Sequence, residues 1–445
     1  MRKINKKKNI QKEEKNIGKK IHHLAKKLWP INRSITGSGV RKSLKILKDI
    51  CPSLAIIEIP SGKKVFDWTI PEEWNVQEAW VKGPKNKKVI NFSDNNLHLV
   101  GYSHSINTSM NLKELKKHLY SLPHQPNAIP YVTSYYKKRW GFCISENQKK
   151  KMQSGKYKIF INSKFTKGSL TYGEIIIPGD TKKEIFLSTN ICHPSMANNE
   201  LSGPTVTIYL AKWIQSLIKR KFTYRIIFIP ETVGSIAYLN KNYKKMKKNI
   251  FAGFNVVCVG DNKNYSYLPS RNGDTISDQI AKHVLNWTDK KYKTYNWSQR
   301  GSDERQYCSP GIDLPIASIM RSKYGEFPEY HTSLDNLTNV VTPTGLQGGY
   351  NVIKRAIEIF EQDCFPKTTN LCEPQLSKRN LYPSLSIKNS ANNTRLMMNV
   401  ISYSDGKTSL LNIAKKLNVS IWSLYPAVKI LLKNKLITTK DKPFK

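Results

Sequence analysis

The sequence has no apolar run long enough to cross a membrane. None of its uninterrupted apolar segments approaches the roughly 18 residues that a membrane-spanning helix needs. The basic amino terminus also lacks the apolar block of a signal peptide. These absences predict a cytoplasmic protein without membrane contact, whose residues 1–16 form a disordered basic tail.

Paired cysteines are absent as well. The seven cysteines are scattered along the chain and no CxxC motif occurs. This pattern argues against a zinc ribbon and predicts reduced, mostly buried thiols.

Acidic residues are few, 32 against 73 basic ones, which gives a net charge of +41. Such a charge is typical of nucleic-acid binding. However, 60 of the basic residues are lysines spread over the whole chain, which favours a general compositional bias over a dedicated nucleic-acid surface. Weak, salt-sensitive adhesion to polyanions is expected in either case.

Four apolar runs stand out in a chain of 445 residues, a length that allows two or three domains. Each run reads as a buried strand followed by polar residues. In an open α/β sheet, ligands bind beyond the carboxyl ends of the strands. The predicted strands are residues 185–192, 224–229, 254–259 and 314–320.

Two histidines and three carboxylates follow these strands. They are His193, Glu200, Glu231, Asp261 and His331. Such a mixture suits a borderline metal such as zinc, with one carboxylate left over as a base. The alternative is that each is an ordinary hydrogen-bonded polar group at a sheet rim. Asn198, Asn199 and Glu200 are expected in a turn-forming loop.

The predicted fold is α/β, with a mixed, mostly parallel sheet and helices on both faces. An α/β domain would comprise residues 17–64 and 154–365, interrupted by a β-rich insertion at 65–153. A linker at 366–393 would lead to a winged helix-turn-helix at 394–445. Winged helices bind DNA or proteins, and both roles stay open.

Several motifs resemble the zinc exopeptidase superfamily, the co-catalytic zinc aminopeptidases. They are CHPSMANNELSGP, FIPETVGSIAYL, VGD, RGSDERQYCSPGIDLPIASI and EYHTSLD, between residues 192 and 335. The set is similar to a bacterial branch that carries an inserted β-rich domain and a carboxyl-terminal winged helix, and that is sometimes tied to polysaccharide biosynthesis. The resemblance is specific because all five motifs occur in this order.

The resemblance implies roles for individual residues. His193, Asp261 and His331 would bind metal, and Glu231 would be the general base that takes a proton from water. Asp303 and Tyr330 would lie near the substrate.

The chain departs from the superfamily pattern at three positions. Asn199 replaces the bridging Asp, and Glu200 is expected to take over as a metal ligand. Thr232 replaces the Glu that binds a second zinc, and Ser195 replaces the Asp that supports the first histidine. We therefore expect one zinc ion, with a second ion as the alternative.

Three functions remain open from the sequence. The first is a metal-dependent aminopeptidase-like hydrolase that cleaves an amide bond at a free amino terminus or in an amino-sugar conjugate. The second is a non-catalytic ligand-binding protein with a peptidase fold. The third is a winged-helix DNA-binding regulator whose α/β domain senses a small molecule. Oligomeric state is not indicated.

Overall fold

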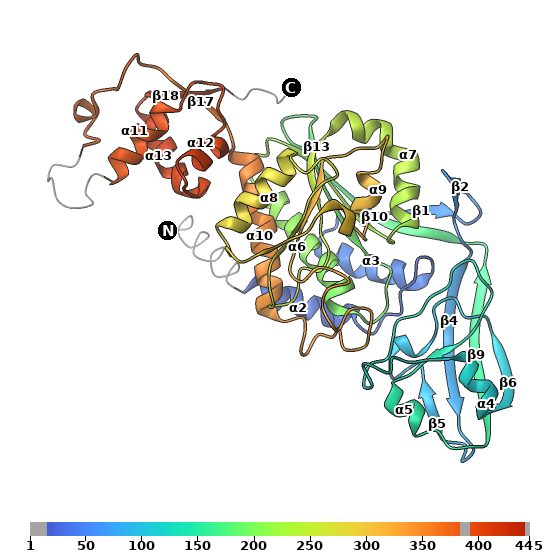
Figure 1. Cartoon of the computed structure of the whole chain (residues 1–445). Coiled ribbons are helices and arrows are strands. Elements are labelled where there is room, and N and C mark those ends of the chain that lie inside the picture. The colour runs from blue at the N-terminus through green and yellow to red at the C-terminus, as the bar shows by residue number, and fades with distance from the viewer. Residues whose placement is uncertain (1–15, 383–391, 441–445) are drawn as a thin grey trace, which may run out of the picture. The chain divides into compact units, whose positions relative to one another are not determined.

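The computed structural model describes residues 16–382 and 392–440, which form two compact units (Figure 1). The larger unit contains the described residues up to 281 together with 291–353. The smaller contains residues 282–290 and the described residues from 354 onward. The predicted basic tail lies, except for Asn16, outside the described residues, as do residues 383–391 of the predicted linker.

An eight-stranded sheet organises the larger unit, in the order β1-β10-β12-β11-β13-β16-β14-β15. The pairs β12/β11, β11/β13 and β13/β16 are parallel, and β1 and β10 are antiparallel additions at one side. This confirms the predicted mixed α/β class. The strands are β1 (Ala55–Pro60), β10 (Ser169–Ile177), β11 (Glu184–Asn190), β12 (Thr223–Ile229), β13 (Ile250–Asn255), β14 (Ser266–Leu268), β15 (Lys293–Thr294) and β16 (Ile316–Met320).

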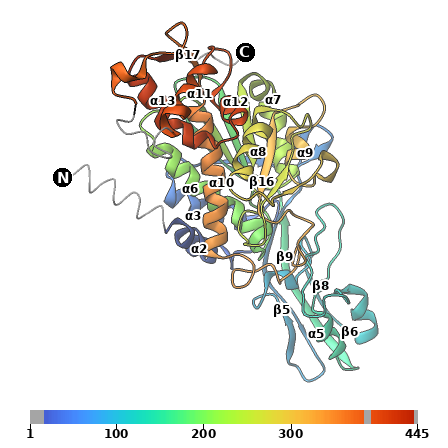
Figure 2. The same ribbon diagram turned by 60° about the vertical axis from the view of Figure 1, so that its left-hand side comes forward.

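The helices α2, α3 and α6 pack against one another on one face of this sheet, whereas α7 and α9 lie on the other face (Figures 1 and 2). β11 is buried along its whole length because helices cover both of its faces and strands flank both of its edges. The helices are α2 (Ile17–Leu28), α3 (Ser38–Ile50), α6 (Ser202–Ser216), α7 (Val233–Asn249), α8 (Ile276–Asn286), α9 (Glu304–Tyr307) and α10 (Pro343–Gln362).

One predicted strand, 254–259, is wrong in its position. β13 begins at Ile250 and ends at Asn255. Val256 adds one further hydrogen bond, to the carbonyl of Ser188, but Cys258 has φ 52°, which is not extended backbone. The apolar residues after Asn255 are therefore a buried loop that leads to Asp261.

The inserted β-rich region is built on a second sheet of order β5-β4-β9-β6. β9 lies beyond residue 153, the predicted end of the insertion, and pairs with both β4 and β6. The strands of the inserted region are β2 (Lys64–Val65), β3 (Trp68–Thr69), β4 (Glu73–Lys82), β5 (Lys88–Asn91), β6 (Ile106–Asn111), β7 (Leu119–Tyr120), β8 (Phe142–Cys143) and β9 (Lys156–Thr166). Short helices are α4 (Leu112–Leu115) and α5 (Glu146–Lys150).

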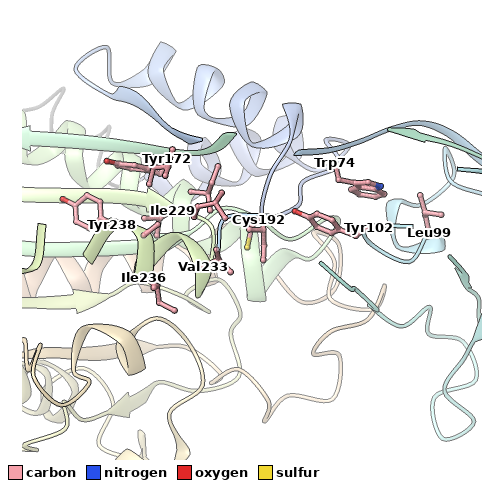
Figure 3. Packing of buried hydrophobic residues seen from close by; sticks show 14 of the residues in the cluster. Trp74, Leu99, Tyr102, Tyr172, Cys192, Ile229, Val233, Ile236 and Tyr238 are labelled. Carbon is pink, nitrogen blue, oxygen red and sulfur yellow. The ribbon is translucent and has the colours of Figure 1, made fainter. Parts of the chain in front are cut away.

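The apolar core is continuous from the main sheet into this insertion. Figure 3 shows Ile229 and Val233 of the α/β region and Trp74 and Tyr102 of the insertion, with Cys192 between the two groups. Trp74 and Tyr102 stack at a ring-centroid separation of 5.3 Å. The two regions therefore share one core.

The smaller unit contains the predicted winged helix. Its elements are α11 (Asn392–Ser402), α12 (Leu410–Lys416), α13 (Ile421–Lys433), β17 (Phe365–Thr368) and β18 (Ile437–Lys440). β17 falls in the segment predicted as a linker, but it pairs with β18. No helix of the described residues has the length and apolar character needed to cross a membrane.

A buried histidine makes this smaller unit sensitive to acid. The backbone N–H of Ile421, at the start of α13, donates to His283 Nε2 at 3.0 Å, so this nitrogen must be unprotonated. Burial, with Lys415 adding to the effect, lowers the pKa of His283 to about 4. In the unfolded chain the pKa of this histidine is about 6.5. Below that pH the unfolded chain binds a proton that the folded chain does not bind.

We therefore expect the unit to lose about 2 kcal/mol of stability between pH 7 and pH 5 because of this group. The measurement is the difference in melting temperature between the natural chain and His283→Gln at both pH values. The natural chain should lose more on acidification. Equal losses in the two proteins would contradict the assignment.

Candidate active site

His193 lies just beyond the carboxyl end of β11, at the centre of the sheet. The N–H of Ile191 still bonds the carbonyl of Ile229, at 3.0 Å, and Pro194 then ends the strand pairing. The His193 side chain is buried. Its Nδ1 lies 2.7 Å from Glu200 Oε2, which leaves Nε2 as the nitrogen that faces other groups.

Glu200 reaches His193 because residues 197–201 form a turn of π-helix. The predicted turn-forming loop is therefore corrected, since Ala197–Leu201 continues directly into α6. The Asp335 carboxylate accepts the N–H groups of Asn198 and Asn199, at 2.7 and 2.9 Å. Burial raises the pKa of Asp335 to about 7, against the effect of these hydrogen bonds.

Arg33, between α2 and α3, lies behind this pair. Its Nε donates to the His193 carbonyl at 3.0 Å and lies 3.8 Å from Glu200 Oε1. Burial lowers the pKa of Arg33, whereas Glu200 opposes that shift. A guanidinium at this place fixes Glu200 against His193.

Glu231 follows β12, the strand adjacent to β11. Its Oε2 lies 3.6 Å from His193 Nε2, and its side chain is 22% exposed. Thr232 has φ 64°, a strained conformation that redirects the chain into α7. Asp303 holds this bend, because its carboxylate accepts the Thr232 N–H at 2.8 Å and the Ser235 hydroxyl at 2.7 Å.

Asp303 was predicted to lie near the substrate, and that role stays a prediction. Its side chain has no exposed surface, so direct contact with a substrate would require the surrounding loop to open. Burial, with Glu231 adding to it, raises the pKa of Asp303 to about 8.

His331 lies opposite His193, with ring centroids 5.7 Å apart. Tyr131 of the insertion contacts both imidazoles, at centroid distances of 5.3 and 5.2 Å. Tyr330 stacks on His331 at 3.8 Å. Because zinc–nitrogen bonds are about 2.0–2.1 Å long, the two imidazoles are within joint reach of a single ion.

The two histidines differ in charge. Burial lowers the pKa of His193, but Cys192, Tyr131 and Glu200 together raise it well above the usual value. Burial and the neighbouring His193 lower the pKa of His331 to about 3. The site therefore favours one positive charge at His193 and keeps His331 neutral, and a neutral imidazole is the form that binds a metal.

Asp261 is buried but already fully hydrogen-bonded. Its Oδ2 accepts from Asn198 Nδ2 at 2.9 Å and from the Ser322 N–H at 2.8 Å. Its Oδ1 accepts from the Lys263 N–H at 2.7 Å and from the Ser322 hydroxyl at 3.0 Å. Asp261 thus holds the loops around the site together, and its predicted metal ligation stays a prediction.

Among residues 16–382 and 392–440, one set of three potential metal ligands has its atoms within 4.8 Å of one another: Cys192, His193 and Glu200. Two of the four predicted ligands, His193 and Glu200, are therefore brought together. Arg33 would repel a cation placed between them. For Glu200 to bind an ion itself, its bond to His193 Nδ1 would have to be given up.

The residues present fit a divalent ion. His331 offers a neutral nitrogen donor, and His193 Nε2 offers a second beside the Glu231 carboxylate once His193 gives up its proton. At the positions that would serve a second ion stand Asn199 and Thr232, which carry no charge. The Thr232 hydroxyl moreover accepts a hydrogen bond from Arg305, a fixed cation, at 2.5 Å.

Sequence reasoning missed Arg33, Tyr131 and Arg305. Arg305 lies inside one of the motifs quoted for the superfamily resemblance, which could have indicated it. No local pattern marks Arg33 or Tyr131, since both reach the site from remote segments.

The chain covers most of the length of several solved zinc peptidases. The aminopeptidase BSAP of Bacillus subtilis shares 12% identity, with a TM-score of 0.57 over 77% of this chain and 94% of that one. A family M28 peptidase precursor from Shewanella amazonensis shares 11%, with a TM-score of 0.54 over 82% and 98%. At these identities the likeness defines the fold, which is that of the zinc aminopeptidases.

The nearer relatives define the family. Residues 22–363 match the model described as domain of unknown function DUF4910, and residues 364–439 match a winged helix-turn-helix model. The chain therefore belongs to the DUF4910 family.

Two nearer matches come from Clostridium acetobutylicum. One carries the name "Putative polysaccharide biosynthesis protein with aminopeptidase-like domain" and is 43% identical over 90% of this chain and 91% of its own length. A crystal structure titled as a putative peptidase from the same organism is 41% identical, with a TM-score of 0.90 over 97% of this chain and 100% of that one.

Proposed function

We propose that the protein is a metal-dependent hydrolase that cleaves an amide bond at a free amino terminus or in an amino-sugar conjugate. The observation that carries this proposal is the arrangement of Glu231, His193 and His331. One carboxylate and two imidazoles face one another, and Glu200 and Arg33 hold the first imidazole in place. The zinc aminopeptidase fold supports the same reaction class.

His193 and His331 would hold the metal ion, most simply one zinc ion. When bound, such an ion polarises a carbonyl group and lowers the pKa of water. Glu231 is placed to accept a proton at Oε2 and to return it to the departing amine. Glu200 fixes the His193 ring so that Nε2 faces Glu231.

The substrate walls would come from Tyr131 and Tyr330, which pack against His331. The name of the Clostridium relative refers to polysaccharide biosynthesis. That name favours an amino-sugar conjugate over a peptide as the natural substrate.

The test is release of amine from aminoacyl arylamides and from N-acylated amino sugars by the full-length chain. Hydrolysis should stop when a chelator removes the metal and return when zinc is restored. Absence of hydrolysis of both substrate classes by the zinc-loaded chain would count against the proposal.

A non-catalytic ligand-binding protein is the second candidate. The hydrogen bond from Arg305 to Thr232 favours it. It places a positive charge at the position where a carboxylate would be needed to bind a second metal ion. This candidate predicts ligand binding without turnover, and binding that tolerates Glu231→Gln.

The winged helix supports a third candidate, a DNA-binding regulator. In α13, however, Trp422 lies against His283, at 5.7 Å between ring centroids, and Arg355 lies over the same indole. This aromatic face is thus occupied inside the unit. A regulator would retard specific DNA in a gel, and deletion of the residues after 393 would abolish that retardation.

A further inference from the structure

Arg305 lies beside the candidate active site, and no acidic side chain of the described residues forms an ion pair with it. The described residues give its side chain one hydrogen bond, to Thr232 Oγ1 at 2.5 Å. Its Nε is shielded from solvent and has no hydrogen-bond partner within that part of the chain. An arginine offers five donors, so most of its binding capacity is unused.

Several other arginines of the same unit are paired with carboxylates, whereas Arg139, Arg220 and Arg321 donate to backbone carbonyls. Arg33 lies beside Glu200, and Arg225 bonds Glu174 and Glu184. Arg271 likewise pairs with Asp313. Arg305 is only partly buried, but its Nε is shielded and lacks a partner among the described residues. Leaving such a donor unpaired is costly, which suggests that a partner for this side chain comes from outside the chain.

The neighbours of Arg305 place it on the side of the candidate active site that contains Glu231. Its hydroxyl partner, Thr232, directly follows Glu231 in the chain. Two tyrosines lie within electrostatic reach of both Glu231 and Arg305. Burial raises the pKa of Tyr135 and of Tyr330, Glu231 adds to each rise, and Arg305 opposes it.

We propose that Arg305 binds an anionic group of the substrate next to Glu231, so that the site selects amides that carry a carboxylate or a phosphate close to the scissile bond. The planar guanidinium suits either anion because both accept two parallel hydrogen bonds. Thr232 holds the guanidinium through Nη2, which leaves Nη1 without a hydrogen bond from the described residues. This inference rests on the proposed hydrolysis for the reaction that follows binding. The anion-binding step itself does not depend on that reaction.

The experiment measures anion binding by isothermal titration of the full-length protein at constant ionic strength. The probes are succinate, inorganic phosphate and the neutral succinamide. Arg305→Gln should weaken binding of the preferred anion by about 10-fold or more, as expected for loss of a charge-assisted hydrogen bond. Arg305→Lys should retain part of the affinity, which also tests whether the altered chain still folds.

Arg300→Gln is the matched control. Arg300 lies on the loop that precedes α9 and is directed to Trp297, with its guanidinium 5.2 Å from the indole centroid. Its replacement should leave anion binding unchanged, although it removes the same charge. Tighter succinate binding would identify a carboxylate as the natural group, and tighter phosphate binding would identify a phosphate.

Three outcomes overturn the inference: wild-type affinity in Arg305→Gln, equal binding of succinamide and succinate, or no saturable anion binding to the natural chain up to about 10 mM. Failure of hydrolysis gives a different result. If no amide is cleaved but anion binding depends on Arg305, the inference holds and the proposed reaction fails. If acidic and neutral amides are cleaved equally with and without Arg305, the reaction holds and the inference fails.

Discussion

Glu231→Gln should lower kcat for amide hydrolysis by about 1,000-fold, within the range expected for loss of a general base. Glutamine keeps the shape of the side chain but cannot accept the proton. Glu231 is only partly exposed, and its Oε2 lies 3.6 Å from His193 Nε2, so the substitution changes charge with little change of packing. Zinc content should remain near that of the natural chain because the two imidazoles are untouched.

Initial rates with an aminoacyl arylamide, together with metal analysis of the same samples, would measure both quantities. Glu114→Gln is a suitable control, since this glutamate is exposed on the insertion. Natural rates in Glu231→Gln would assign the base to another residue. Zinc loss in that variant would instead make Glu231 a metal ligand.

His193→Ala and His331→Ala should each weaken zinc binding by at least about 100-fold, since loss of a supporting residue alone costs 10–100-fold. Both rings are required because they face one another at 5.7 Å across the proposed ion position. Zinc per chain, measured by elemental analysis after dialysis, should fall from about one to near zero in both variants.

His124→Ala provides the control, because His124 is an exposed histidine on the insertion. It should retain zinc and turnover. Full zinc content in either active-site variant would remove that imidazole from the proposed pair. Two ions per natural chain would favour the alternative of a second metal, despite Asn199 and Thr232.

The convergence of His193 and Glu231 could be predicted from sequence because both follow apolar runs that form adjacent parallel strands. The carboxyl ends of these strands lie at the same edge of the sheet, which brings the two side chains together regardless of the loop conformations. His331 could be added through the superfamily resemblance, although it lies far along the chain.

The orientation of Glu200 could not be predicted. It depends on a π-helical turn whose N–H groups are held by Asp335, more than 130 residues away. The end of β13 was also unpredictable, because apolar residues continue past Asn255 without a change of pattern. Only pairing with β11 and β16 decides where that strand stops.

The insertion contributes backbone as well as side chains to the loop that carries His331. Tyr131 N–H donates to the His331 carbonyl at 2.8 Å, and the N–H of Ser333 donates to the carbonyl of Ile129 at 2.9 Å. Gln125 adds a bond to the carbonyl of Pro328 at 2.8 Å, across 203 positions of sequence.

Because of these hydrogen bonds, the β-rich insertion cannot be exchanged without affecting the loop that carries His331. A homologue that altered residues 125–131 to admit a new substrate would also shift the imidazole beside them. Metal affinity and substrate specificity should therefore change together during evolution.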